Sequence, residues 1–397
     1  MINSPKALRL HIALLGRVNA GKSSFLNLVT DQQTSITSAI AGTTTDVVEK
    51  AQELPPIGPV LWLDTAGFGD STELSAQRMK KTLKVLERAD IVLLVCEGDK
   101  IGNIEKQIID LSKQKDIPLL KIYNKSDCYE IASDDGIKVN SLNKHSKDNV
   151  LNLLKNKILD ICPKDFIEHQ TMLCDLLAPQ STVIMIVPLD YEAPKGRLIL
   201  PQVQAIRECL DYGHNIMVVK EDNYLNALSN LKTPPALVIC DSQVVDIMVK
   251  QTPPDIPCTT FSILMARLKG DLATFVRGAQ KISNLQENDR ILIAESCTHH
   301  AVADDIGRVK IPFLLRQKTG KNLRIDFVSG CDFPDNLGEY QLVIQCGGCT
   351  FNRRAILSRI NQCLEAGTDI TNYGVCISEL KGVLSRVLEP FKKTESL

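Results

Sequence analysis

The chain has 397 residues, of which 44% are hydrophobic, and its 46 basic and 47 acidic side chains leave a formal charge of −1 at pH 7. This length exceeds one ordinary domain. The balanced charge, without a long basic run, argues against nucleic-acid binding, and no apolar run approaches the ~18 residues that cross a membrane. The 13 scattered cysteines predict free thiols in a reducing compartment, hence a cytoplasmic protein, and leave room for a metal site.

An apolar run, Leu8 to Leu15, leads directly into a phosphate-loop motif. The segment 16–23 reads GRVNAGKS, which fits G-x-x-x-x-G-K-[ST]. Its glycines let backbone N–H groups face phosphate oxygens, Lys22 can reach the outer phosphates, and the Ser23 hydroxyl can ligate Mg²⁺. A helix is expected to follow over 24–29. We therefore predict a nucleoside triphosphate site, with contacts from Gly16, Asn19, Ala20, Gly21, Lys22, Ser23 and Ser24.

Two further segments follow strand-like runs and select the nucleotide. The segment DTAG at 64–67 places the Asp64 carboxylate where it can hold Mg²⁺ through water, and the Gly67 N–H where it can meet the γ-phosphate. The segment NKSD at 124–127 brings Asn124, Lys125 and Asp127 to the base. Because a carboxylate at 127 can accept from the ring N–H and the exocyclic amine of guanine, GTP is favoured over ATP. The segment 139–141 is a weak candidate for a further guanine contact.

These motifs resemble the small G domains of the TrmE and Era branch, over about the first 165 residues. The resemblance implies that Thr44 supplies a switch ligand to Mg²⁺, although Thr45 stands where that branch has arginine. It also implies that Asn19 coordinates K⁺ and that hydrolysis is faster in K⁺ than in Na⁺; the alternative for Asn19 is a loop residue that tolerates tight backbone geometry. Phe68 replaces the glutamine of Ras-like enzymes, so slow intrinsic hydrolysis is expected.

Two further α/β patterns follow the G-domain motifs. Strand-like and helix-like segments alternate between Thr182 and Cys240, which predicts a small parallel sheet with right-handed crossovers that suits a subunit interface. A third pattern begins near Gly270. We therefore predict an α/β protein of three domains: a P-loop G domain over 1–170, a small parallel α/β domain over 171–268, and a third α/β domain over 269–397.

Cysteines follow the ends of two strand-like runs in the third domain. Cys297 and His299 come after the run 290–295, and the segment CGGC at 346–349 comes after the run 340–345. Open α/β sheets bind ligands at this edge, and the glycines let both thiolates of CGGC face one point. Three thiolates can hold a [4Fe-4S] cluster with one iron left for an outside ligand, or zinc together with His299. The spacing does not choose between them.

Over its whole length the chain resembles the HydF family of [FeFe]-hydrogenase maturation GTPases. The resemblance rests on the domain order, on CTH at 297–299 and on CGGC at 346–349; Gln345 stands where the family often has histidine, which leaves the fourth iron ligand open. It implies a homodimer formed through the middle domain and a [4Fe-4S] cluster on Cys297, Cys346 and Cys349. It further implies that a transient di-iron subcluster precursor passes from radical-SAM maturases to apo-[FeFe]-hydrogenase.

Two other classes of protein share parts of this pattern. An RNA-binding GTPase of the Era or TrmE kind would have the same G motifs and a basic face. A G protein with a structural Cys₃His zinc site would use His299 as the fourth ligand. Among the other cysteines, Cys331 is a weaker candidate ligand, whereas Cys96, Cys240 and Cys376 are expected to be buried apolar residues.

Overall fold

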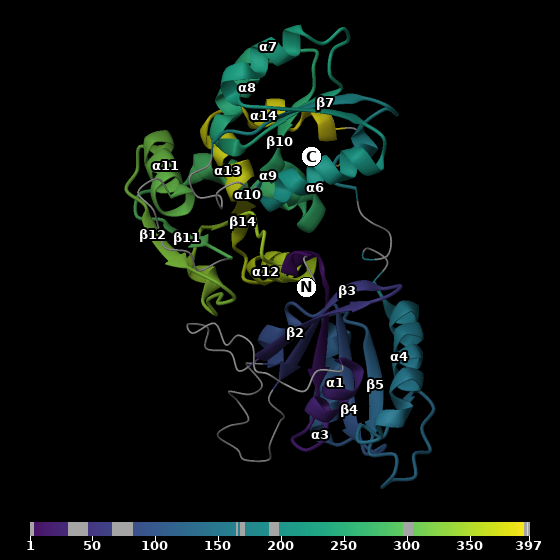
Figure 1. Ribbon diagram of the computed structural model, residues 1–397. Coiled ribbons are helices and arrows are strands. Elements are labelled where there is room, and N and C mark those ends of the chain that lie inside the picture. Colours follow the sequence, from purple (N-terminus) through teal and green to yellow (C-terminus); the bar gives the residue numbers. More distant parts are fainter. Residues whose placement is uncertain are drawn as a thin grey trace. The chain divides into compact units, whose positions relative to one another are not determined.

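The computed structural model divides into two compact units, which comprise residues 1–169 and 170–397 (Figure 1). It describes residues 4–30, 47–65, 82–163, 166, 171–189, 198–296, 305–392 and 395. Several residues named above therefore lie outside the described ranges, and their predicted roles have no structural counterpart here: Thr44, Thr45, Gly67, Phe68, Cys297 and His299.

The first unit is built on a six-stranded sheet with the order β2-β3-β1-β4-β5-β6. Its neighbouring strands are parallel except that β2 runs antiparallel to β3. All residues of β1 are buried, as expected for a parallel strand that is covered on both faces. The bounds are β1 (Leu10–Leu15), β2 (Val47–Leu54), β3 (Gly58–Thr65), β4 (Ile91–Glu97), β5 (Leu119–Asn124) and β6 (Gly136–Lys138).

Helices cover both faces of this sheet. Because side chains alternate along a strand, Ile12 and Leu14 of β1 pack with Phe25 of one helix, whereas Ala13 of the same strand packs with Ile108 of another. The parallel strands β1, β3, β4, β5 and β6 all end at one edge, where the loops that carry the predicted motifs begin. The helices are α1 (Lys22–Thr30), α3 (Asn103–Gln114) and α4 (Lys147–Ile161).

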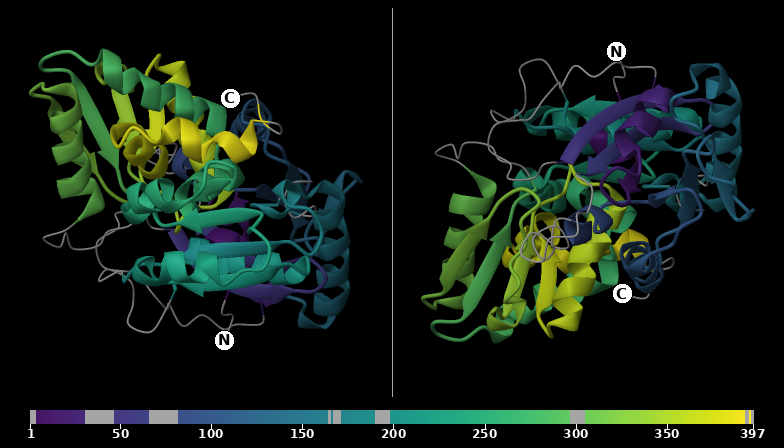
Figure 2. Two further views of the ribbon diagram at one scale, coloured as in Figure 1. Left: turned by 90° about the horizontal axis from the view of Figure 1, so that it is seen from above. Right: turned by 90° about the horizontal axis from the view of Figure 1, so that it is seen from below.

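The second unit contains two parallel four-stranded sheets, ordered β10-β9-β7-β8 and β12-β11-β13-β14. Figure 2 shows them as separate sheets, one teal and one green to yellow. These two sheets and the P-loop sheet confirm the predicted three-part α/β architecture. The bounds are β7 (Thr182–Ile186), β8 (Asn215–Val219), β9 (Leu237–Cys240), β10 (Cys258–Thr260), β11 (Arg290–Ala294), β12 (Arg324–Val328), β13 (Leu342–Gln345) and β14 (Asp369–Asn372).

One hydrophobic core joins the two sheets of the second unit. It includes Ile184 and Ile239 from the first sheet and Leu292 and Val343 from the second. The helix α9 packs between the halves, since it contacts α6 on one side and α12 and α13 on the other (Figure 1). The helices are α6 (Leu200–Asp211), α7 (Tyr224–Ser229), α8 (Val245–Gln251), α9 (Phe261–Lys269), α10 (Leu272–Gln280), α11 (Ile311–Thr319), α12 (Arg353–Glu365), α13 (Tyr373–Leu380) and α14 (Leu384–Val387).

Each of the three sheets has a point at which the strand order reverses. In the first sheet, β3 lies on one side of β1 and β4 on the other, so the order reverses between β1 and β4. In the third sheet, β12 lies on one side of β11 and β13 on the other, so the order reverses between β11 and β13. Open α/β sheets bind ligands beside the carboxyl ends of the strands at such a point. Across the described ranges, no helix is both long and apolar enough to cross a membrane.

Candidate functional site

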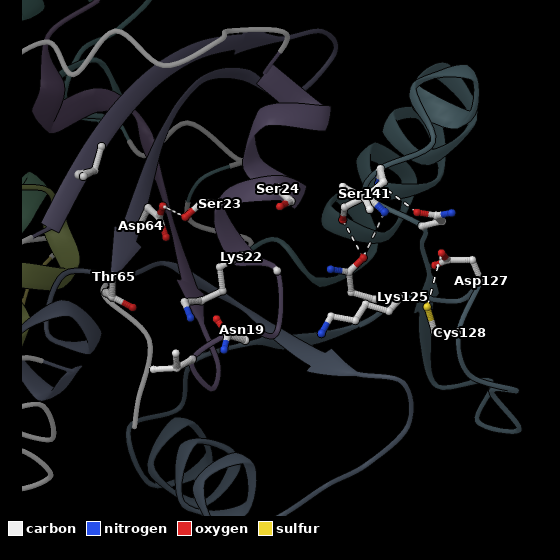
Figure 3. Close-up of a pocket in the computed structure, with 16 residues that line it drawn as sticks. Asn19, Lys22, Ser23, Ser24, Asp64, Thr65, Lys125, Asp127, Cys128 and Ser141 are labelled. Carbon is white, nitrogen blue, oxygen red and sulfur yellow. Dashed lines mark hydrogen bonds between the residues drawn. The ribbon is translucent and has the colours of Figure 1, made fainter. Parts of the chain in front are cut away.

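A pocket of about 790 Å³ lies at the carboxyl edge of the first sheet (Figure 3). Loops that follow β1, β3, β5 and β6 contribute to it. Figure 3 shows Ser23 and Asp64 at one end and Asp127 at the other, with Lys22 and Asn19 between them. The predicted contact residues that line it are Asn19, Gly21, Lys22, Ser23, Ser24, Asp64, Asn124, Lys125 and Asp127.

The loop after β1 requires its two glycines. Gly16 has a φ of +146°, and a Cβ there would lie 2.3 Å from the carbonyl oxygen of Val95. Gly21 has a φ of +91°, and a Cβ there would lie 2.1 Å from the amide nitrogen of Asn124. Asn19 also adopts a left-handed conformation, with a φ of 65°, which asparagine tolerates better than most residues. The backbone therefore makes a tight turn in which a residue with a Cβ would clash at positions 16 and 21.

Lys22 folds back over this loop. The residue is 6% exposed, and its Nζ donates to the carbonyl oxygens of Gly16 at 3.0 Å and Arg17 at 2.8 Å. Burial lowers the pKa of Lys22 to about 8, and the nearby Asp64 carboxylate opposes that shift. The ammonium group is thus held in place at the floor of the pocket before any phosphate is bound.

Ser23 and Asp64 form a small oxygen-rich group beside Lys22. The Ser23 hydroxyl donates to Oδ2 of Asp64 at 3.1 Å. Burial raises the pKa of Asp64, and its Oδ1 is buried without a hydrogen-bond partner in the part of the chain that the structure describes. Hydroxyl and carboxylate oxygens are the ligands that Mg²⁺ prefers. A carboxylate oxygen that lacks a partner beside a hydroxyl fits a bound cation.

Asn124 joins the phosphate end of the pocket to the base end. Its amide donates to the carbonyl oxygen of Ala20 at 2.9 Å, and its Oδ1 accepts from the backbone N–H and the hydroxyl of Ser141, at 3.2 and 2.7 Å. Ser141 was only a weak candidate on sequence because its segment lacks the usual pattern. Lys125 donates to Glu97 at 2.7 Å, and the exposed Asp127 carboxylate can face a base.

Residues 346–351, which we term the cysteine loop, follow β13 at the reversal point of the third sheet. The backbone N–H and the hydroxyl of Ser296, after β11, both lie 3.0 Å from Sγ of Cys346. Thr350 donates back to the carbonyl oxygen of Ser296 at 3.1 Å. Gly348, with a φ of +62°, makes the turn between the two cysteines. The loops after β11 and β13 are therefore joined through a cysteine sulfur.

A lysine that the sequence analysis did not identify lies beneath this loop. Lys269, the last residue of α9, is 4% exposed, and its Nζ donates to the carbonyl oxygens of Gly348 at 3.0 Å and Phe351 at 2.8 Å. Burial lowers the pKa of Lys269 to about 8, whereas the thiols of Cys349 and Cys346 oppose the shift. Its nearest hydrogen-bonding partners are far away in sequence, so no local motif indicates it.

The cysteine loop fits a thiolate-bound metal group in part. Cys346 is half-buried and Cys349 exposed, and Ser296 directly precedes the predicted ligand Cys297 in the chain. Across the described ranges, no three His, Cys, Asp or Glu residues are grouped as a metal site would require.

Gln345 is 1% exposed, and its Oε1 has no partner among the described residues. Cys331 is exposed, and Cys96, Cys240 and Cys376 are buried as expected.

Three family models match consecutive parts of the chain. A model described as 50S ribosome-binding GTPase matches residues 11–125. The hydrogen maturase F dimerization domain matches residues 172–270, and the hydrogen maturase F tetramerization domain matches residues 273–390. The last two together cover more than half of the chain. The chain belongs to the hydrogen maturase F family. This confirms the family resemblance found in the sequence, and it identifies a GTPase domain followed by two self-association domains of that family.

Curated relatives match a shorter part of the chain. The tRNA modification GTPase MnmE of Brachyspira hyodysenteriae is 32% identical over 38% of this chain and 34% of that protein. The GTPase Der of Kosmotoga olearia is 31% identical over 30% of this chain and 28% of that protein. A solved structure of a probable GTP-binding protein, engB, is 19% identical over 40% of this chain and all of that chain, with a TM-score of 0.28. The chain thus spans about a third or less of these curated relatives' length.

Proposed function

We propose that this protein hydrolyses GTP in its first domain and holds a [4Fe-4S] cluster at the cysteine loop, from which a transient di-iron subcluster precursor is assembled or delivered to apo-[FeFe]-hydrogenase. The cluster assignment rests on one observation: the backbone nitrogen of Ser296, which precedes Cys297, lies 3.0 Å from Sγ of Cys346 at the reversal point of the third sheet. Membership in the hydrogen maturase F family supports the role in hydrogenase maturation.

The nucleotide pocket supports the following division of roles. The backbone of the loop 16–23 surrounds the phosphates, and Lys22 neutralises their charge. Ser23 and Asp64 hold Mg²⁺, with Thr44 as a further ligand, and the Gly67 N–H contacts the γ-phosphate. At the base end, Asp127 accepts from guanine, while Asn124 and Lys125 hold the surrounding loops in place through Ala20 and Glu97.

Asn19 is proposed as the residue that coordinates K⁺ near the phosphates. Its left-handed backbone gives it a second, conformational role, so the variant Asn19→Gly is informative because glycine keeps this backbone and removes only the amide. We expect wild-type GTP hydrolysis to be faster in K⁺ than in Na⁺ at equal ionic strength, and Asn19→Gly to lose the difference. Equal wild-type rates in the two salts would refute the role of K⁺.

At the cysteine loop, Cys297, Cys346 and Cys349 would hold the cluster. Cys297 follows directly on Ser296, and consecutive Cα atoms are only about 3.8 Å apart, which supports a shared ligand set. When bound, the cluster would supply a redox-active iron centre with one iron open to an outside ligand. The described residues orient the loop: Ser296 donates its N–H to the sulfur of Cys346, and Thr350 fixes the carbonyl group of Ser296.

Self-association and partner exchange complete the proposal. The dimerization and tetramerization domains support a homo-oligomer, with a homodimer as its basic unit. The radical-SAM maturases and apo-[FeFe]-hydrogenase are the proposed partners, in the cytoplasm, and GTP turnover would switch contacts with them. Exchange of GTP for GDP is then expected to change the affinity for a maturase in a binding assay, and an unchanged affinity would refute the switch.

The first experiment measures iron, sulfide and zinc in protein purified without oxygen, together with EPR spectra after reduction. We expect about four iron and four sulfide per chain and a reduced-cluster signal that Cys346→Ala weakens. The control is Cys331→Ala, which removes an exposed thiol from the same unit and is expected to keep full iron content. Zinc without iron would favour the structural zinc site instead, and would refute the cluster assignment.

A further inference from the structure

The environment of Lys269 is unusual for a lysine. The residue is 4% exposed, and its ammonium group makes hydrogen bonds to two carbonyl oxygens of the cysteine loop. An ammonium group has three N–H donors, so these two bonds leave one donor for another acceptor. The carbonyl oxygens of Gly348 and Phe351 lie on either side of Cys349 in the chain, so the lysine braces the segment that carries this cysteine.

Among the described residues, no carboxylate contributes to the electrostatic environment of Lys269. The ionisable groups nearby are the thiols of Cys349 and Cys346, which carry a negative charge only as thiolates. A buried cation is costly unless an anion or a set of hydrogen bonds compensates it. Carbonyl dipoles compensate in part, and an anionic group bound through the two cysteines would complete the pairing.

The lysine comes from a different domain from the cysteines. Lys269 ends α9 and lies within the part of the chain that matches the dimerization domain, whereas the cysteine loop lies within the part that matches the tetramerization domain. Arg353, at the start of α12, fixes the same helix end through the carbonyl oxygens of Leu268 and Gly270, at 2.8 and 3.2 Å. Arg353, from the other side of the domain boundary, therefore helps to set the position of Lys269 under the loop.

We propose that Lys269 is a positioning residue for the metal site: it holds the cysteine loop through two carbonyl groups and supplies the buried positive charge that faces the anionic, thiolate-bound iron-sulfur group. This inference rests on the proposed function. A positive charge beside a cluster favours the reduced state, because reduction adds a negative charge, and hydrogen bonds and charges around a cluster are known to set its potential. Loss of the charge should therefore make the cluster harder to reduce.

The test uses the full-length protein, reconstituted with iron and sulfide without oxygen. Lys269→Met removes the charge and both hydrogen bonds, Lys269→Gln keeps a donor without the charge, and Lys269→Arg keeps the charge. The matched control is Lys381→Met, because Lys381 also donates to a carbonyl oxygen of this unit, that of Gln243 at 3.1 Å, but has a carboxylate partner in Asp246. The readouts are iron and sulfide content, the reduction potential from an EPR-monitored titration, and the rate of iron release to a chelator.

We expect a more negative potential in Lys269→Met and Lys269→Gln, faster iron release in Lys269→Met, and wild-type values in Lys269→Arg and Lys381→Met. Cluster loss in Lys269→Met and Lys269→Gln with retention in Lys269→Arg would also support the inference. A wild-type potential in both uncharged variants at full iron content would overturn it, as would cluster loss in all three Lys269 variants. Wild-type protein that takes up no iron-sulfur group would instead refute the proposed function.

Discussion

The nucleotide pocket and the cysteine loop hold their backbones in the same way. Each loop follows a parallel strand at a point where the strand order reverses, and each contains a glycine with positive φ. In each, a buried lysine donates to two loop carbonyl oxygens, at 2.8 and 3.0 Å. They differ in the origin of the lysine. Lys22 lies five and six residues from its partners, whereas Lys269 lies 79 and 82 residues away. The lysine of the nucleotide pocket therefore belongs to the same sequence motif as its partners, whereas tertiary packing brings Lys269 to the cysteine loop.

The charges around the two lysines differ as well. Lys22 has the Asp64 carboxylate nearby, which stabilises its ammonium group in the absence of nucleotide. In the part of the chain that the structure describes, Lys269 has two carbonyl oxygens and the nearby thiols of Cys349 and Cys346 around it, but no carboxylate partner. In the nucleotide pocket a carboxylate of the protein thus stabilises the buried lysine, whereas at the cysteine loop we propose that a bound anionic group does so.

The largest expected effect concerns a glycine of the first loop that leaves no room for a Cβ, compared with a glycine of the cysteine loop that does. Gly16→Ala would place a Cβ 2.3 Å from the backbone oxygen of Val95, whereas Gly347→Ala would meet nothing within 4 Å. We expect Gly16→Ala to destabilise the first unit by about 3 kcal/mol, from overpacking and backbone strain, and Gly347→Ala to change stability by less than about 0.5 kcal/mol. Urea unfolding measures both, with the fluorescence of Trp62 as the signal for the first unit, since this buried side chain is the single tryptophan. Equal effects would contradict the comparison.

A smaller effect is expected from the side chains that join neighbouring loops. Asn124→Ala removes a buried amide that is bonded to Ala20 and Ser141, so we expect a loss of about 2–3 kcal/mol, because buried partners are left unsatisfied. Thr350→Val removes one half-buried bond to Ser296 at the other site and should cost about 1 kcal/mol. Thermal unfolding followed by circular dichroism ranks the two variants. A larger loss for Thr350→Val would mean that the cysteine loop is the more rigidly connected of the two.

The smallest expected effect is a pH dependence of nucleotide affinity. Lys22 has a pKa of about 8 in the nucleotide-free protein, and bound phosphate groups must raise it because they stabilise the ammonium form. Affinity should therefore be constant below pH 8 and fall above it, by at most about tenfold per pH unit. Titrations with a fluorescent guanine nucleotide between pH 7 and 9.5 measure this. In Lys22→Arg, whose guanidinium stays charged, the affinity should not fall with pH; a flat profile in the wild type would contradict the assignment.

The features predicted from sequence are those with local signals. The helix expected over 24–29 lies within α1, and the apolar run Leu8 to Leu15 contains β1, since a helical period and a continuous apolar run define them. The loop 16–23 was predicted because its spacing is fixed by the phosphate it binds. The antiparallel edge strand β2 was not predicted, because its half-exposed residues follow no alternating pattern. Ser141 and Lys269 act through partners that only the fold brings near them, so no window of sequence indicates their roles.

The hydrophobic core that both sheets of the second unit share limits which truncated forms of the protein can fold. A protease cut or a truncation between α9 and α10 would leave Lys269 on one piece and the cysteine loop on the other, and it would expose the apolar faces around Leu292 and Val343 to water. The shortest fragment expected to keep the loop's geometry therefore begins ahead of β7. The parts of the chain that match the dimerization and tetramerization domains would then unfold together, as one cooperative folding unit, rather than as two separable modules.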